Sequence, residues 1–177
     1  MSNAKQQGEL DGLCGMYAIV NALRKMGVSR EDEVFQTCCE ALCSSRWPDT
    51  LWEGTTLRDI EVMLKGCRAA DIKGVERITV SYPFRRTEPK SNKEFWDSFY
   101  ELFQENRANK CAILGLAEPS LHWLVANPNG SGIRFTDSGV RKPVTVPQNM
   151  IYAGSRRSGK ETHRIERKEV ILFERHS

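Results

Sequence analysis

The sequence lacks an apolar run long enough to span a bilayer, and its first residues lack the continuous apolar segment of a secretory leader. Hydrophobic residues make up 40% of the 177 positions and charged residues 28%, which is ordinary for a globular chain in water. These absences argue against a membrane protein. We therefore expect no membrane partner and favour a cytoplasmic location.

A large excess of charge of one sign is also missing, because the formal net charge is only +3. The basic residues gather mainly between positions 156 and 175, where they alternate with Glu, Thr and Ser. A nucleic-acid-binding surface needs a denser basic patch with interleaved aromatic residues. We therefore predict no nucleic-acid partner and interpret this region as a solvated face.

The six cysteines lack the spacing of a disulfide framework, and a secretory context is missing as well. Cys38, Cys39 and Cys43 lie close together but form no C-x-x-C pair and have no second ligand cluster. No glycine-rich segment follows the phosphate-loop pattern either. The sequence thus predicts reduced thiols, no metal site and no cofactor.

What the sequence does contain is a helical half followed by a strand-rich half. Apolar residues recur at helical spacing over 14–26, 30–43, 57–66 and 92–106. Ser29, Thr56 and Ser91 stand where the last three of these helices would be capped. Short apolar or alternating segments predict strands over 78–82, 110–116, 121–126, 133–137, 144–146, 151–153 and 169–173. The order predicts an α+β fold in a single domain, helical over about 1–75 and strand-rich over about 76–177.

Cys14 has the most unusual position of the six thiols, because it opens an amphipathic helix in Asp11-Gly-Leu-Cys-Gly15. Unpaired backbone N–H groups and partial positive charge at a helix N-terminus favour the thiolate, which is the nucleophilic form. The same amides can hold an oxyanion. Burial as a small hydrophobic side chain is the alternative for Cys14.

A nucleophilic cysteine needs a base, and only three histidines are present, two of which, His163 and His176, lie in the polar tail. His122 instead interrupts an apolar strand, where an imidazole must find a hydrogen-bond partner. Asp137 follows on the next strand of a hairpin whose turn is 127–132, so it can fix the tautomer of His122. A core histidine and a turn-forming aspartate are the alternatives.

These residues resemble the papain-like cysteine peptidases, and especially the bacterial peptidase domains of bacteriocin exporters. Leu13-Cys-Gly15 leading into a helix, His122-Trp-Leu-Val125 in a strand and Asp137 after a turn match that family's pattern in type, order and approximate spacing. The resemblance covers about a fifth of the chain. It implies a two-lobed fold in which Cys14 is the nucleophile, His122 the general base and Asp137 the orienting acid.

One position departs from the family's pattern, which places an oxyanion-hole glutamine about six residues before the cysteine. Position 8 is Gly8, so Gln7 is the residue we expect to act there, with Gln6 as the alternative. Asp11-Gly-Leu-Cys14 also resembles the start of the ovarian-tumour-type deubiquitinating peptidases, where the loop itself builds the oxyanion site.

The expected activity is therefore hydrolysis of a peptide or isopeptide bond in a protein or peptide substrate, through Cys14, His122 and Asp137. Acyl transfer or glutamine deamidation uses the same acyl-enzyme, and a catalytically silent binding module would keep the cleft. The sequence does not distinguish these alternatives. It leaves the substrate and the oligomeric state open.

Overall fold

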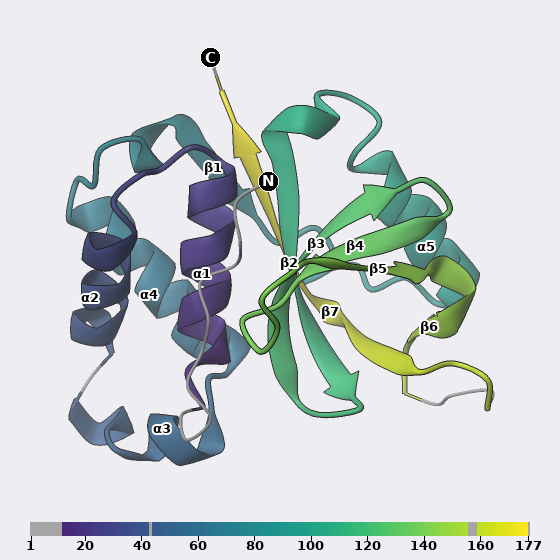
Figure 1. Ribbon diagram of the computed structural model, residues 1–177, viewed down its shortest axis with the longest axis horizontal. Coiled ribbons are helices and arrows are strands. Elements are labelled where there is room, and N and C mark those ends of the chain that lie inside the picture. Colours follow the sequence, from purple (N-terminus) through teal and green to yellow (C-terminus); the bar gives the residue numbers. More distant parts are fainter. Residues whose placement is uncertain (1–11, 43, 156–158, 177) are drawn as a thin grey trace.

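The computed structural model describes residues 12–42, 44–155 and 159–176, and it places the helices of the N-terminal half beside the sheet of the C-terminal half (Figure 1). Its α-helices are α1 (Cys14–Lys25), α2 (Glu31–Ala41), α3 (Asp49–Glu53), α4 (Leu57–Ala69) and α5 (Asn92–Glu101). Its strands are β1 (Ile78–Ser81), β2 (Lys110–Glu118), β3 (His122–Asn129), β4 (Gly132–Thr136), β5 (Val144–Pro147), β6 (Ile151–Ala153) and β7 (His163–Arg175).

The strands form a single seven-stranded sheet in the order β1-β7-β2-β3-β4-β5, with β6 added to β7. Every pairing is antiparallel except that of β6 with β7. The predicted α+β class, with N-terminal helices packed on a C-terminal sheet, is confirmed. The predicted hairpin between β3 and β4 is present too, and its pairing runs to Asn129 and Gly132.

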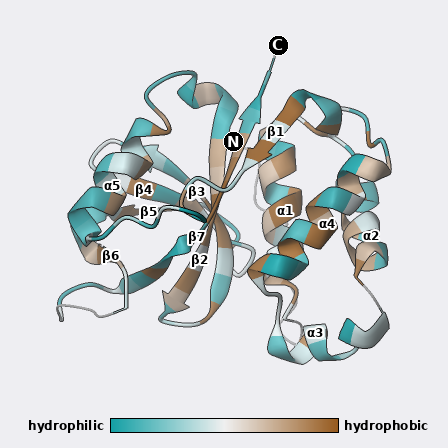
Figure 2. Ribbon diagram, turned by 180° about the vertical axis from the view of Figure 1, so that it is seen from behind, coloured by the Kyte–Doolittle hydropathy of each residue, from teal (hydrophilic) through white to brown (hydrophobic). Residues whose placement is uncertain are grey.

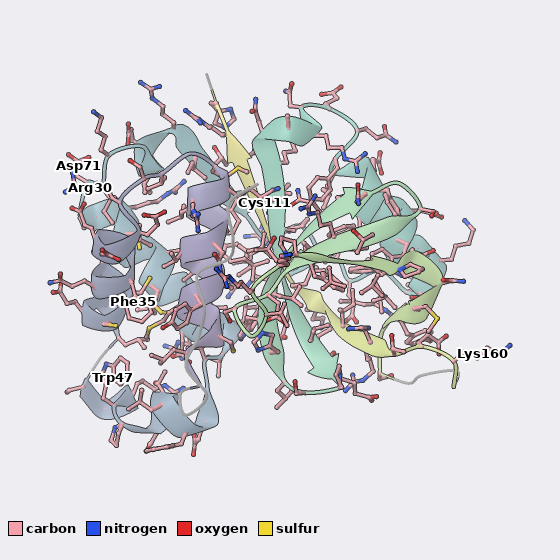
Figure 3. All side chains as sticks on the ribbon, in the orientation of Figure 1. Arg30, Phe35, Trp47, Asp71, Cys111 and Lys160 are labelled. Carbon is pink, nitrogen blue, oxygen red and sulfur yellow. The ribbon has the colours of Figure 1, made fainter. Side chains whose placement is uncertain are left out.

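Both faces of the sheet are covered, which explains why β2 is apolar at almost every position. Cys111 and Ile113 pack against α1 and its neighbours, while Ala112 and Leu114 face the second core around α5. The thiol of Cys111 lies 3.8 Å from the carbonyl oxygen of Ala22, so it marks the contact between α1 and the sheet (Figure 3). The hydrophobic residues accordingly line the junction of α1, α4 and the central strands (Figure 2).

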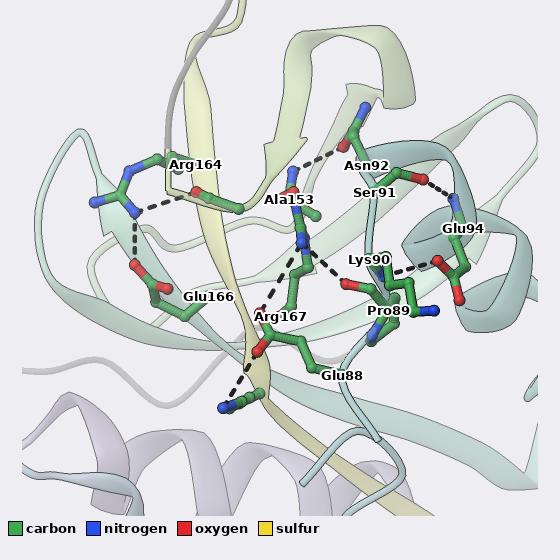
Figure 4. A network of polar contacts seen from close by, with 12 residues as sticks. Glu88, Pro89, Lys90, Ser91, Asn92, Glu94, Ala153, Arg164, Glu166 and Arg167 are labelled. Carbon is green, nitrogen blue, oxygen red and sulfur yellow. Dashed lines mark hydrogen bonds and ion pairs between the residues drawn. The ribbon is translucent and has the colours of Figure 1, made fainter. Parts of the chain in front are cut away.

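The prediction of a solvated face over 156–175 is only partly correct for the residues that the structure describes. β7 lies between β1 and β2, and Ile165 and the stretch from Val170 to Phe173 are buried. Arg167 of this strand donates to the carbonyl oxygens of Ala153 and Pro89, which ties the strand to β6 and to the approach to α5 (Figure 4). Arg164 and Arg167 thus serve as internal ties, whereas Lys160, Lys168 and Arg175 are exposed.

Two of the three predicted helix caps are confirmed. The hydroxyl of Thr56 accepts from the amide of Asp59, and that of Ser91 accepts from the amide of Glu94. The cap predicted at Ser29 is wrong, because α2 begins after Arg30 without a side-chain cap. Three acidic residues in its first turn favour that helix start through the helix dipole instead.

Candidate active site

Cys14 is the first residue of α1, and only 7% of its surface is exposed. Because the first four amides of a helix have no intrahelical carbonyl partner, the backbone around Cys14 can donate to an anion. The apolar face behind it is fully packed, since Met16 and Ile19 are completely buried. The helix therefore holds the thiol in a fixed place at the edge of the cleft.

The two glycines that flank this start are required by close packing. The amide of Gly12 donates to the carbonyl oxygen of Leu51, and a Cβ on Gly12 would lie within about 3 Å of backbone atoms of Leu51 and Gly54. A Cβ on Gly15 would collide with the side chain of Thr55. The loop before Cys14 and the segment after α3 are thus in direct contact.

Gly12→Ala is expected to lower the free energy of unfolding by about 1 to 3 kcal/mol, because the added methyl group meets backbone that cannot rotate away. Urea unfolding of the variant and the parent measures the loss. Unchanged stability would show that the 51–54 segment can move aside, contrary to the packing described.

His122 is the first residue of β3, and Asp137 directly follows the last residue of β4. The Nε2 atom of His122 lies 2.6 Å from the Oδ1 atom of Asp137. The amide of Gly139 donates to the same oxygen at 2.7 Å. Burial alone would raise the pKa of Asp137, but these two hydrogen bonds hold it below its ordinary value.

The side chain of His122 also interacts with the thiol of Cys14, which lines the same cleft. Because Nε2 is occupied by Asp137, Nδ1 is the ring nitrogen left for the sulfur. Burial lowers the pKa of His122, but the contacts with Asp137 and Cys14 outweigh it and raise the pKa to about 9. The thiol, the imidazole and the carboxylate therefore meet at one place, and the imidazolium is the favoured form at neutral pH.

A hydrogen bond across the site fixes the distance between the two sides. The indole Nε1 of Trp123 donates to the carbonyl oxygen of Thr55 at 2.7 Å, and Trp123 directly follows His122 on β3. Thr55 in turn packs against Gly15, next to the nucleophile. This chain of contacts couples the sheet that carries the histidine to the helix that carries the cysteine.

Cys14 and His122 open onto a cleft of about 280 Å³. The other residues that line it are Arg46, Glu53, Gly54, Thr55, Thr56, Leu116, Leu121, Trp123 and Glu169. The guanidinium of Arg46 is held by Asp59 at 2.9 Å, where Asp59 also completes the cap of α4. The cleft thus lies directly beside the thiol.

No model of a known protein family matches the sequence, and no curated protein does either. The site therefore stands on its own geometry. Within the described ranges, no helix is long and apolar enough to cross a membrane. The same ranges bring no three His, Cys, Asp or Glu side chains together as a metal site.

The structure brings together three of the four residues predicted for the site, namely Cys14, His122 and Asp137. The fourth, Gln7, lies outside the described residues, as do Gln6 and Asp11. Trp123 lines the cleft, whereas Trp47 packs against the helical core.

Two residues near the site are not found by sequence reasoning. His163, assigned to the polar tail, is half-buried against Phe135 at a ring separation of 5.8 Å and within electrostatic reach of Asp137. Burial lowers the pKa of His163. Glu169 lines the cleft, although its only sequence signal is an acidic residue at the start of an apolar strand.

Proposed function

We propose that this chain is a papain-like cysteine peptidase that hydrolyses a peptide or isopeptide bond. The observation that carries the proposal is that one imidazole, His122, bonds to the carboxylate of Asp137 and interacts with the thiol of Cys14 in the same open cleft. A purely structural role for His122 would not explain why a cysteine at a helix N-terminus lies beside it. The arrangement is the one that activates a thiol nucleophile.

In the proposed reaction, the thiolate of Cys14 attacks the substrate carbonyl carbon and forms a tetrahedral intermediate. The C–N bond then breaks as the His122 imidazolium gives its proton to the leaving amine. Water attacks the resulting thioester while neutral His122 takes its proton. Collapse of the second intermediate releases a carboxylic acid and restores the thiolate and the imidazolium.

The oxyanion of each intermediate needs hydrogen-bond donors that are already in place. We assign one of them to the backbone N–H of Cys14, which the start of α1 leaves without an intrahelical partner. The second is proposed to be the side-chain amide of Gln7. Asp137 keeps the imidazole in the orientation that serves the sulfur.

The proposed fold is the two-lobed papain-like one, and the helices on one side of the cleft with the sheet on the other are consistent with it. The resemblance to the peptidase domains of bacteriocin exporters remains part of the proposal. So does a cytoplasmic location.

The proposal is tested by incubating a proteome-derived peptide library with the protein and with its Cys14→Ala variant, and reading the products by mass spectrometry. The protein is expected to generate new peptide termini, and Cys14→Ala is expected to generate none above background. Cys111→Ala is a matched control, because that thiol is buried at the interface of α1 with the sheet and should not affect turnover.

Other products would contradict peptide hydrolysis in specific ways. A slight mass gain on intact peptides that depends on Cys14 would identify a glutamine deamidase, and amine adducts would identify acyl transfer. Turnover that persists in Cys14→Ala would remove Cys14 from the mechanism. A library left unchanged by the protein would favour a binding module.

A further inference from the structure

The cleft contains one carboxylate with no role in the proposed triad, that of Glu169 on β7. It is half-buried, and no side chain of the described residues pairs with it or donates to it. Burial and the neighbouring Glu166 raise the pKa of Glu169, as expected for a carboxylate that has lost water without gaining a cation.

An irregularity in the pairing of β2 with β7 places the carboxylate of Glu169 at the cleft. The pairing of β2 with β7 is irregular between Leu114 and Leu116, where β7 runs from Val170 to Ile165. Glu169 leaves the regular ladder there and lies over Gly115, in the space that any side chain at position 115 would fill. Gly115 therefore provides the room for a carboxylate beside the site.

The remaining charges of the cleft do not neutralise Glu169. Arg46 lines the same cleft, but its guanidinium is paired with Asp59. Glu53, exposed at the end of α3, adds a second negative charge. The cleft thus holds two carboxylates, those of Glu53 and Glu169, next to the candidate nucleophile.

The cleft that holds this carboxylate also has apolar surface. Leu116 and Leu121 both line it, and 83% of the surface of Leu121 is exposed. The side chains of lysine and arginine consist of an aliphatic chain that ends in a cation. Among amino acids, only these two could contact the leucines of the cleft and also pair with Glu169. A neutral or acidic side chain would leave Glu169 desolvated and unpaired.

We propose that Glu169 is the specificity-determining residue of the site and selects substrates with a lysine or arginine side chain beside the bond that is cleaved. This inference rests on the proposed function for its substrate class. The electrostatic part of the inference does not require peptide hydrolysis, since Glu169 would favour any cationic reagent that reacts with the sulfur of Cys14.

Thiol reagents of matched size and different charge test this electrostatic effect of Glu169 without requiring turnover. The rates at which cationic 2-aminoethyl methanethiosulfonate and neutral propyl methanethiosulfonate modify Cys14 are compared at pH 8 by peptide mapping. The ratio of the two rates cancels any change in the reactivity of the thiol itself. Glu169→Gln is expected to lower the cation-to-neutral ratio by about three- to tenfold, as removal of one nearby, partly screened charge implies.

Glu101→Gln serves as the matched control, because it removes the same charge from an exposed position on α5. The cation-to-neutral ratio of this variant should equal that of the parent protein. An equal ratio in Glu169→Gln would overturn the inference, even if the peptide library is cleaved.

The peptide-library assay provides a second test of the role of Glu169. Cleavage that depends on Cys14 should be enriched in lysine or arginine at one position next to the new termini, and Glu169→Gln should abolish that enrichment. An enrichment that survives the substitution, or its absence from the unmodified protein, would overturn the assignment of Glu169 and leave the peptidase proposal intact. A charge-dependent reagent ratio without any cleavage would reject the peptidase proposal alone.

Discussion

Replacing His122 with alanine is expected to lower kcat/KM by about 10³-fold or more, because it removes both the proton donor to the leaving group and the partner of the thiol. The activity is followed on a peptide that the library assay identifies. The loss should fall mainly on kcat, since His122 acts on groups that change charge during the reaction.

His176→Ala is the matched control for this variant. His176 is exposed and contacts Thr79 at the far edge of the sheet, so its replacement should leave kcat/KM unchanged. A His122→Ala variant that retains the activity of the parent would show that another group serves Cys14, and the proposed mechanism would fail.

Asp137→Asn is expected to lower kcat/KM by about 10²-fold or more and to change its pH dependence. The proposed resting state needs an imidazolium, so activity is lost as the pH rises through the pKa of His122, which is about 9. Asp137 is one of the groups that raise this pKa. Its replacement by a neutral amide should therefore move the alkaline limb of the profile to lower pH.

The pH profile of kcat/KM from pH 5 to 10 measures this shift directly. Asp97→Asn is a suitable control, since it removes an exposed carboxylate that pairs with Lys93 on α5. An alkaline limb that stays in place in Asp137→Asn would contradict the assignment of Asp137 as the partner of His122.

The parts of the fold that sequence reasoning predicts are those governed by local patterns. Thr56 and Ser91 are found as caps because the side chain and the amide that it accepts from are three residues apart. His122 and Asp137 are found because a turn of known composition lies between their strands. The spacing also predicts that His122 and Asp137 lie close together, since the start of one strand and the end of the next antiparallel strand meet at the same end of the sheet.

The features that sequence reasoning misses depend on contacts between distant segments. The central position of β7 is set by its pairing with β1 and β2, which no local pattern reveals. Glu169 reaches the cleft only because that pairing is irregular beside Gly115. His163 approaches Asp137 for the same reason, as its strand is drawn into the sheet.

The close contact between the nucleophile helix and the 51–56 segment is also beyond local reasoning. The glycines at positions 12 and 15 suggest an open loop, whereas the structure packs both against other backbone or side-chain atoms. That contact, with the hydrogen bond from Trp123 to Thr55, sets the distance between the two sides of the cleft.

The measurement that tests the central claim most directly is the rate at which iodoacetamide alkylates Cys14 between pH 5 and 9, read by peptide mapping in the parent and in His122→Ala. If His122 holds the sulfur of Cys14 as a thiolate, the parent is expected to react rapidly even at the acid end, and the variant should lose this acid-side reactivity. Alkylation of the parent that follows the pH dependence of a free thiol and is unaffected by His122→Ala would contradict the account.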